Sequence, residues 1–450
     1  MTATTEVVGD DEGAAAAEPA YGFPAPLWRT LERLRPPGPL FRASVFTSPV
    51  RGPWLTSVFA SVLLVGLPLL TITGLLSYAA YEPRFAGNPF PADPGILRLP
   101  YFPWPAGPSW LYRLNQGVHV GLGLALVPVV LAKLWSVIPK LFTWPPARSV
   151  AQLLERLSLL LLVGSILFEL ATGILNIQYW YVFRFDFYTA HYFGAWVFIG
   201  AFALHVFLKL PTMVRSLKSR SLTEELRTPL ARTVPEPPDE HGLVSPAPGT
   251  PTISRRGVLA LVGGGSAVIT LLTLGETVGV RATALLSPRG RSYGDGPTDF
   301  QINRTARVAQ VTPDVTGASW RLVLKGGPRE VSLDRAALLA MPQHTAELPI
   351  ACVEGWSTVQ TWTGVRLRDL VSMTGVQGLS SGTVRSLEKA GAFAQATLSR
   401  GQLMADDALL ALQVNGVDLS LDHGYPARVI VPAAPGVHNT KWVREIEVRT

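Results

Sequence analysis

The sequence has 450 residues, 48% of them hydrophobic, and its 39 basic and 32 acidic residues leave a formal net charge of +7. This length suggests two or three domains, and the positive charge taken alone would suit a nucleic-acid-binding protein. The basic residues, however, concentrate beside long apolar runs, as the positive-inside rule for membrane proteins predicts. Composition therefore favours a membrane protein, and we expect no nucleic-acid partner.

The first 50 residues begin with an Ala-rich, acidic stretch and end in a basic one, which predicts a disordered cytoplasmic tail and a flank to the membrane. Beyond them, five apolar runs approach the roughly 20 residues that cross a bilayer. The runs cover residues 54–81, 114–132, 157–180, 187–208 and 257–275. We therefore predict five transmembrane helices, the first four forming a membrane domain over residues 51–215.

The distribution of basic residues predicts the orientation of these spans. Arginines and lysines gather before the first span, between the second and third, and after the fourth, whereas the other two loops carry few. The side with more basic residues faces the cytoplasm. We therefore expect a multi-pass protein of the cell membrane, with a cytoplasmic N-terminus and with the residues after about 285 outside.

Residues 216–253 are predicted to form a cytoplasmic linker, because the prolines after residue 228 disfavour helix. Arg255 and Arg256 then open the fifth apolar run, which predicts a twin-arginine signal anchor over residues 254–285. Its partners would be the twin-arginine and general secretion translocases; the alternative is an ordinary positive-inside flank. Ala282-Thr283-Ala284 has the form of a cleavage site, but the long apolar run favours retention of the span.

Histidines within the spans indicate a cofactor, since ionisable groups are costly in a bilayer. His119 and His191 lie at similar depths near the outer face, and such a pair facing across a bundle can hold a haem iron. His205 lies 14 residues beyond His191 with no histidine or methionine opposite it. Glu169 is either a proton carrier, a partner in the haem pocket or a structural hydrogen-bonding group. A structural role for the histidines is the alternative to one haem b.

The spacing of histidines on the second and fourth spans resembles the haem b membrane subunits of respiratory oxidoreductases. That likeness covers about residues 50–215.

Residues 286–450 read differently, with short alternating strands separated by Gly and Pro. The pattern predicts a β-rich α+β domain large enough for its own core. It contains the only cysteine of the chain, Cys352. A lone cysteine outside the cytoplasm is a buried thiol, a nucleophile or a metal ligand, and a thiolate suits a metal held mostly by a cofactor's own sulfurs.

Four ordered motifs in this domain resemble the molybdopterin domain of the sulfite oxidase superfamily. They are CysValGluGlyTrpSer at 352–357, TrpThrGlyValArgLeuArgAspLeu at 362–370, HisGlyTyrProAlaArgValIleValPro at 423–432 and LysTrp at 441–442, with AspPheGlnIleAsnArg at 299–304 extending the match. The first motif resembles the periplasmic methionine sulfoxide reductase branch more than it resembles the sulfite oxidases. The whole chain resembles polytopic actinobacterial molybdoproteins exported by the twin-arginine route.

This resemblance implies roles for six residues. Cys352 would bind molybdenum and Glu354 would orient the site or relay a proton. Asn303 would contact the pterin, and His423, Arg428 and Lys441 would hold the cofactor phosphate, for which charged donors are suited. The arginines that bind an oxyanion in sulfite oxidases are missing after Cys352, so a small-molecule or protein sulfoxide is a better expectation than sulfite.

Together these features predict a molybdenum-dependent oxidoreductase that performs oxygen-atom or two-electron transfer outside the membrane. A membrane haem b would connect it to the quinone pool. Two alternatives remain open at this point. One is a haem-free anchored molybdoenzyme served by a soluble redox partner protein, and the other is a non-catalytic binding module on a degenerate molybdopterin fold.

Overall fold

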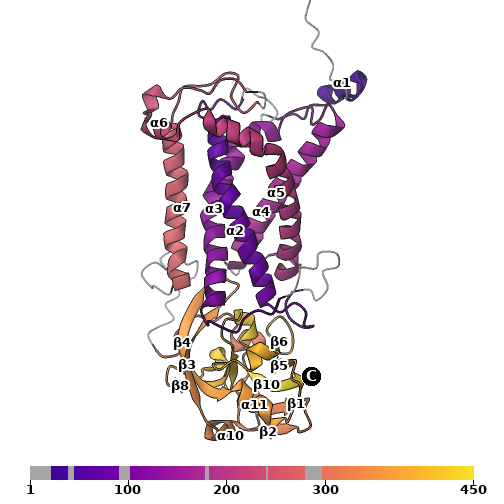
Figure 1. Ribbon diagram of the computed structural model, residues 1–450, viewed down its shortest axis with the longest axis vertical. Helices are drawn as coiled ribbons and strands as arrows, with labels where there is room; N and C mark the ends of the chain where they lie inside the picture. Colours follow the sequence, from indigo (N-terminus) through magenta and orange to yellow (C-terminus); the bar gives the residue numbers. More distant parts are fainter. Residues whose placement is uncertain (1–21, 39–44, 91–101, 178–181, 240–241, 279–295) are drawn as a thin grey trace, which may run out of the picture.

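The computed structural model describes residues 22–38, 45–90, 102–177, 182–239, 242–278 and 296–450. The predicted tail over residues 1–21 and the cleavage pattern at 282–284 lie outside these residues. A bundle of long helices occupies one end of the molecule and a β-rich domain the other (Figure 1). The fold class predicted from the sequence, five apolar helices plus an α+β domain, is confirmed.

Within the described residues, five helices are long and apolar enough to cross a membrane. They are α2 (Pro53–Ala80), α3 (Leu111–Leu141), α4 (Val150–Ile177), α5 (Phe187–Lys218) and α7 (Arg255–Val278). Each has an apolar surface on nearly all sides, as expected of a helix that faces lipid as well as protein. Helices α2 to α5 pack around a shared apolar core, and α7 lies along α3 outside them (Figure 1).

The segments at the far end of the bundle are more ordered than the sequence suggests. Helix α1 (Ala25–Arg33) forms within the predicted basic flank, and the linker contains α6 (Leu222–Arg227) and a three-residue 3-10 helix, η4 (Leu230–Arg232). The expectation that no helix forms after residue 228 therefore fails for one turn, because Pro229 is tolerated as the residue that precedes a helix.

Residues of the linker also pack against the bundle. The Glu236 carboxylate accepts a hydrogen bond from the Trp54 backbone N–H (3.0 Å), and the Trp54 indole donates to the Arg220 carbonyl (3.0 Å). Arg255, only 1% exposed, donates to the Val234 carbonyl and lies near the carboxylates of Glu225 and Glu236. The first arginine of the pair thus ties the linker to the start of α7.

The C-terminal domain contains two five-stranded sheets. One has the order β2 (Val331–Leu333), β1 (Leu322–Lys325), β10 (Val443–Arg449), β5 (Ser381–Ser386) and β6 (Gln395–Ser399). The other has the order β3 (His344–Ala351), β4 (Ser357–Arg366), β7 (Leu409–Val414) and β8 (Val417–Asp418). Strand β9 (Arg428–Ile430) also pairs with β7, along residues 409–411. Only β1 and β10 pair in parallel.

Short helices connect these strands. They are α8 (Ala306–Ala309), α9 (Pro313–Thr316), α10 (Arg335–Ala340), α11 (Leu367–Met373), α12 (Arg400–Leu403), η6 (Leu421–His423) and η7 (Gly436–His438). The main core lies between the sheets, where Leu322, Leu324, Leu398 and Leu410 are fully or almost fully buried. A second cluster around Trp362 and Ile350 includes Cys352 and places it at the edge of this core.

Candidate functional site

Cys352 lies in the tight turn between β3 and β4, at the face of the domain that meets the helix bundle. Its N–H donates to the Trp356 carbonyl (2.9 Å), and its carbonyl accepts from the N–H of Gly355 (3.1 Å). Gly355 has a φ of 86°, which favours glycine at this position. The turn holds the thiol at a fixed place, with the residue only 2% exposed.

Two segments bearing the predicted phosphate-binding residues meet at Gly424. Its φ is 112°, and a Cβ there would lie 3.2 Å from the Cβ atoms of both Arg428 and Lys441. The Val429 N–H donates to the Thr440 carbonyl (2.9 Å), which joins the two segments into one ladder. A glycine in the HisGlyTyrPro motif is therefore needed to bring the two basic residues together.

Both basic side chains are buried but only partly satisfied by protein groups. Lys441 donates to the carbonyls of Arg304 and Asp422, both at 2.7 Å, and Arg428 makes one long bond to the His423 carbonyl (3.4 Å). Burial lowers the pKa of Arg428 to about 9, and burial with the nearby Arg428 charge lowers the pKa of Lys441 well below its usual value. A negative ligand between them would relieve both effects.

Several buried polar atoms around these residues have no hydrogen-bond partner in the described part of the chain. They are Arg428 Nε, His423 Nδ1, both ring nitrogens of His438, Asn439 Nδ2 and Thr440 Oγ1. A buried donor without a partner costs about 1 to 3 kcal/mol. Such a group of unpartnered polar atoms fits a polar, anionic cofactor that supplies their hydrogen-bond partners, as a pterin with a phosphate does.

The ring of His423 is held by contacts with residues 298–300. Its Nε2 lies 2.8 Å from the Thr298 carbonyl and must donate there, and its ring stacks on Phe300 at 3.7 Å. Burial and the charges of Arg428 and Lys441 lower the pKa of His423 to about 3. The neutral ring therefore presents an acceptor at Nδ1, unless a bound anion favours a second proton.

The remaining predicted residues also lie in this region. Asn303 accepts from the Arg304 N–H (2.9 Å), and the adjacent Arg304 carbonyl binds Lys441. Glu354 lies beside the indole of Trp356, which donates to its carboxylate (3.0 Å), and burial raises the pKa of Glu354 to about 8. At neutral pH this carboxyl therefore carries a proton beside Cys352.

The helix bundle covers the cysteine turn directly. Arg113 of α3 donates to Ser357 Oγ (3.1 Å), and Asn176 of α4 donates to the Val353 carbonyl (3.4 Å). Tyr81, Tyr112 and Tyr188 lie within electrostatic reach of Cys352 and pack with Ala351 and Val437 in one apolar cluster. Sequence reasoning missed these contacts, because nothing in the chain marks residues so distant from Cys352 as its neighbours.

Immediately beyond the cysteine turn, a cavity of about 170 Å³ opens inside the bundle, and His119, His191 and Val353 all line it. The two imidazole rings lie 6.3 Å apart between centroids and are nearly perpendicular. This separation is close to what two imidazoles need to share one metal at about 2 Å from each nitrogen. The predicted histidine pair is thus brought together by α3 and α5.

Each histidine is oriented by acceptors on a neighbouring helix. His119 Nδ1 lies 3.1 Å from the Leu70 carbonyl and 3.2 Å from Thr73 Oγ1, and His191 Nδ1 lies 2.9 Å from the Glu169 carboxylate. An N–H at Nδ1 leaves the lone pair of Nε2 free to bind a metal. Histidines that bind metals are commonly oriented in this way, by an acceptor at the other ring nitrogen. His205 takes no part in this pocket.

The C-terminal domain matches a known family. Residues 309–450 match the family described as "Oxidoreductase molybdopterin binding domain". The domain is therefore a molybdopterin-binding oxidoreductase domain of the sulfite oxidase type, preceded by five long apolar helices.

Named relatives carry the same domain. The chain is 28% identical over 174 residues to "Sulfite oxidase, mitochondrial" of Drosophila melanogaster, covering 33% of this chain and 30% of that one. It is 31% identical over 165 residues to "Sulfite oxidase" of Gallus gallus, covering 30% and 36%. It is 35% identical over 103 residues to "Nitrate reductase [NAD(P)H]" of Hordeum vulgare, covering 21% and 12%.

The chain spans about a third of the length of the two sulfite oxidases that it matches. Together with the family match over residues 309–450, these relatives confirm the predicted enzyme class, a molybdenum-dependent oxidoreductase.

Proposed function

We propose that this protein is a membrane-bound molybdopterin-dependent oxidoreductase that exchanges electrons with the quinone pool through one haem b in its helix bundle. One observation carries the proposal: the turn that holds Cys352 also forms part of the wall of the His119 and His191 cavity, through Val353. A metal bound at Cys352 and an iron between the histidines would therefore be separated by a single turn of chain and a few aromatic rings.

In the C-terminal domain, Cys352 would ligate molybdenum, and Arg428 and Lys441 would hold the cofactor phosphate. The unpartnered donors of Asn439 and Thr440 would bind other acceptors of the cofactor. The bound group supplies oxygen-atom or two-electron transfer chemistry. Glu354, which holds a proton at neutral pH, is placed to deliver it to the site, and Asn303 would contact the pterin.

In the bundle, the lone pairs on Nε2 of His119 and His191 would be the two haem ligands. Glu169 and the Leu70 carbonyl fix the orientation of these rings. Phe187 stacks on the His191 ring at 5.0 Å between centroids and keeps water from that side. A Cβ on Gly74 would come within 3.1 Å of His119, so the glycine leaves room for the ring.

The substrate we propose is of the sulfoxide type and a small molecule rather than a folded protein. Cys352 is 2% exposed, and Tyr81, Tyr112 and Tyr188 pack in one cluster over the neighbouring residues Ala351 and Val437. A folded protein substrate would not have access to the cysteine. Sulfite is disfavoured because the turn carries ValGluGlyTrpSer rather than oxyanion-binding arginines after the cysteine. The methionine sulfoxide reductase branch is the proposed relative within the family.

We further propose that residues after 285 lie outside the cell membrane and reach it through the twin-arginine route. Helix α1 and the C-terminal domain lie at opposite ends of the bundle (Figure 1), as an odd number of spans requires. In cells, replacing Arg255 and Arg256 with Lys should leave the domain inside. Because Arg255 also contacts Glu225 and Glu236, Glu225→Gln with Glu236→Gln is the control for a loosened linker.

Protease accessibility of the domain in intact spheroplasts measures the result. The domain should become protected in the double lysine variant and remain accessible in the glutamine control. Equal accessibility in all three proteins would contradict twin-arginine export.

The electron route is tested with the purified full-length protein. Molybdenum and haem are quantified, the chain is reduced with a quinol, and reoxidation by methionine sulfoxide is followed in the haem spectrum. The proposal expects about one haem and one molybdenum per chain and substrate-dependent haem oxidation. Molybdenum without haem would favour the anchored enzyme with a soluble redox partner, and neither metal would favour a non-catalytic module.

A further inference from the structure

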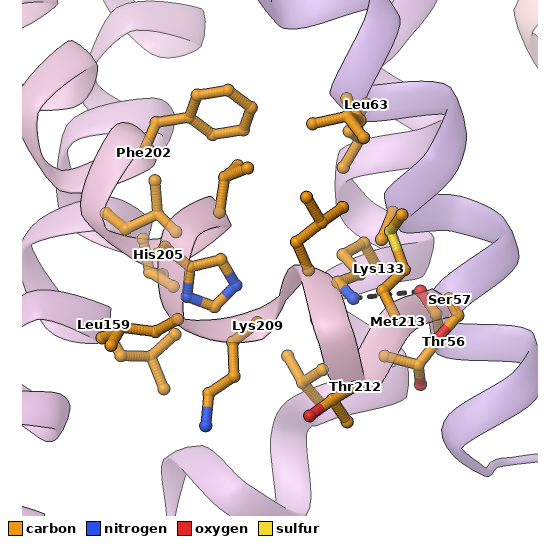
Figure 2. Close-up of a pocket in the computed structure, with 18 of the residues that line it drawn as sticks. Thr56, Ser57, Leu63, Lys133, Leu159, Phe202, His205, Lys209, Thr212 and Met213 are labelled. Atoms are coloured by element: carbon orange, nitrogen blue, oxygen red, sulfur yellow. Dashed lines mark hydrogen bonds between the residues drawn. The ribbon is translucent and has the colours of Figure 1, made fainter. Parts of the chain in front are cut away.

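A second cavity of about 210 Å³ lies in the same bundle, at the end away from the C-terminal domain. Helices α2 to α5 all contribute to it, and its lining is mostly apolar, with Leu63, Leu159 and Phe202 among the side chains (Figure 2). It adjoins the histidine cavity, because Ile166 and Phe198 line both.

Two polar side chains reach into this cavity from opposite sides. His205 of α5 and Lys133 of α3 face the same space (Figure 2). Lys133 donates one hydrogen bond, to the Thr56 carbonyl at 3.0 Å. Within the described part of the chain, Lys133 has no carboxylate partner and the His205 ring makes no hydrogen bond. A cation without a carboxylate counter-ion inside an apolar bundle is costly and usually functional.

The positions of these residues repeat those of the haem-pocket histidines. Lys133 follows His119 by 14 residues, and His205 follows His191 by 14. Fourteen residues are close to four helical turns, about 21 Å, so each pair lies on a similar face of its helix. The second pair contains a lysine where the first has a histidine. Lys133 is held by the Thr56 carbonyl of the neighbouring helix, whereas no acceptor for the His205 ring lies among the described residues.

We infer that this cavity binds the head group of a membrane quinone, with Lys133 and His205 donating hydrogen bonds to its two carbonyl oxygens. A quinone head group is uncharged, has an acceptor at each end of a flat apolar ring, and carries an apolar tail. It therefore matches an apolar cavity with one donor on either side. The inference rests on the proposed function and names the site at which the bundle meets the quinone pool.

Ionisable groups at the mouth of the cavity suit proton exchange. The Glu155 carboxylate pairs with Lys209 (2.6 Å) and Lys140 (3.2 Å), and all three line the cavity. Each quinol that is oxidised loses two O–H protons and two electrons, and each quinone that is reduced gains the same. The electrons are exchanged with the haem proposed in the adjoining cavity, and the protons pass through His205 and Glu155.

The test uses the full-length protein in detergent and the quinone analogue heptyl-hydroxyquinoline N-oxide, whose fluorescence is quenched on binding. Lys133→Met and His205→Leu should each weaken binding about tenfold, the loss expected for one hydrogen bond to a charged or strongly polar group. Lys218→Met is the matched control, because Lys218 is an exposed residue of α5 that does not line the cavity. It should bind like the wild type.

Unchanged affinity in both cavity variants would overturn the assignment. So would a second haem in the wild-type spectrum that both variants lose, since the cavity would then hold iron. If the variants fail to fold, an azidoquinone cross-linked to the wild-type chain gives the answer: labelled peptides should come from 130–140 and 198–213, and labels elsewhere contradict the site. Binding does not require haem, so a haem-free chain that binds the analogue would refute the proposed electron route alone.

Discussion

The cysteine site and the histidine cavity share one wall, the turn after Cys352, but they differ in whether their buried polar atoms have hydrogen-bond partners. Around the cysteine, Arg428, His438, Asn439 and Thr440 keep atoms without partners in the described chain. In the bundle, the Nδ1 atoms of His119 and His191 are both held by acceptors on a neighbouring helix.

The difference follows from the ligands that the two sites would hold. An organic anion is recognised by donors, and these must remain unpaired until it arrives. A metal is recognised by lone pairs, and the ligand rings must be oriented beforehand, because misoriented ligands cost affinity. Substitutions in the first site should therefore change cofactor content or chemistry, and those in the second should change haem binding.

The largest effect is expected from Cys352→Ser. A hydroxyl is a harder and much less acidic donor than a thiol, so turnover should fall by about a thousandfold or more, the scale of removing a group at the reacting centre. Pterin content should stay near that of the wild type, because Arg428 and Lys441 remain. Viologen-driven reduction of methionine sulfoxide and electron paramagnetic resonance measure this. A molybdenum spectrum identical to that of the wild type would refute ligation by Cys352.

Removing either haem ligand should abolish the haem. His119→Ala and His191→Ala should each lose the reduced α-band, because one imidazole in an apolar cavity does not hold the iron in a low-spin state. His205→Ala is the matched control on α5 and should keep most of the band. A visible difference spectrum of the purified protein distinguishes them, and the reverse pattern would show that the pairing is wrong.

The sequence was sufficient to predict the five apolar helices and the α+β class of the C-terminal domain. Apolar length defined the five spans, and the alternating strands with the Cys352, His423 and Lys441 motifs defined the domain. Histidine depth alone placed His119 opposite His191. These features are local in the sequence or depend on regular helix geometry, so they do not require knowledge of the tertiary structure.

What the sequence did not predict depends on contacts between distant segments. The Arg113 bond to Ser357 and the tyrosine cluster over Cys352 require the two domains to be docked. Lys133 lies 14 residues after His119, and this separation can be seen in the sequence. It does not by itself indicate a site, because a lysine is not a usual haem ligand.

Arg428→Ala should lower cofactor content rather than stop the chemistry at a bound cofactor. The phosphate would lose a buried charge-assisted partner, at a cost of about 2 to 4 kcal/mol. Arg368→Ala, which removes an ion pair with Asp406 at the surface of the same domain, is the control and should keep its molybdenum. Metal analysis after purification gives the result, and full molybdenum content in Arg428→Ala would remove this residue from the site.

Glu169→Gln should have a smaller effect, on the properties of the haem rather than its presence. The carboxylate holds His191 Nδ1 at 2.9 Å, and loss of such an outer partner typically costs about 10- to 100-fold in affinity. Loss of the negative charge should also raise the haem reduction potential. Thr172→Val, which removes a weaker 3.4 Å contact to the same nitrogen, is the control. Potentiometric titration that shows equal potentials in the three proteins would contradict this role.

The smallest effect is expected in the pH dependence of the cofactor-free protein. Burial with the charges of Arg428 and Lys441 lowers the pKa of His423 from 6.5 to about 3, and burial lowers the pKa of His438 to about 4. The unfolded chain protonates both near pH 6.5, so it binds more protons than the folded chain below that pH. Stability should therefore fall as the pH decreases from 6.5 towards 3.

His423→Gln should reduce the dependence of stability on pH, because it removes one of the two histidines. The glutamine amide can still donate to the Thr298 carbonyl. His344→Gln is the control, because His344 is a partly exposed histidine of the same domain that contacts Asp407. Denaturant midpoints of protein made in a host without the cofactor, measured at several pH values below 6.5, give the slopes. Equal slopes in His423→Gln and the wild type would mean that His423 is already protonated in the folded chain, as a donor to the cofactor phosphate would need to be.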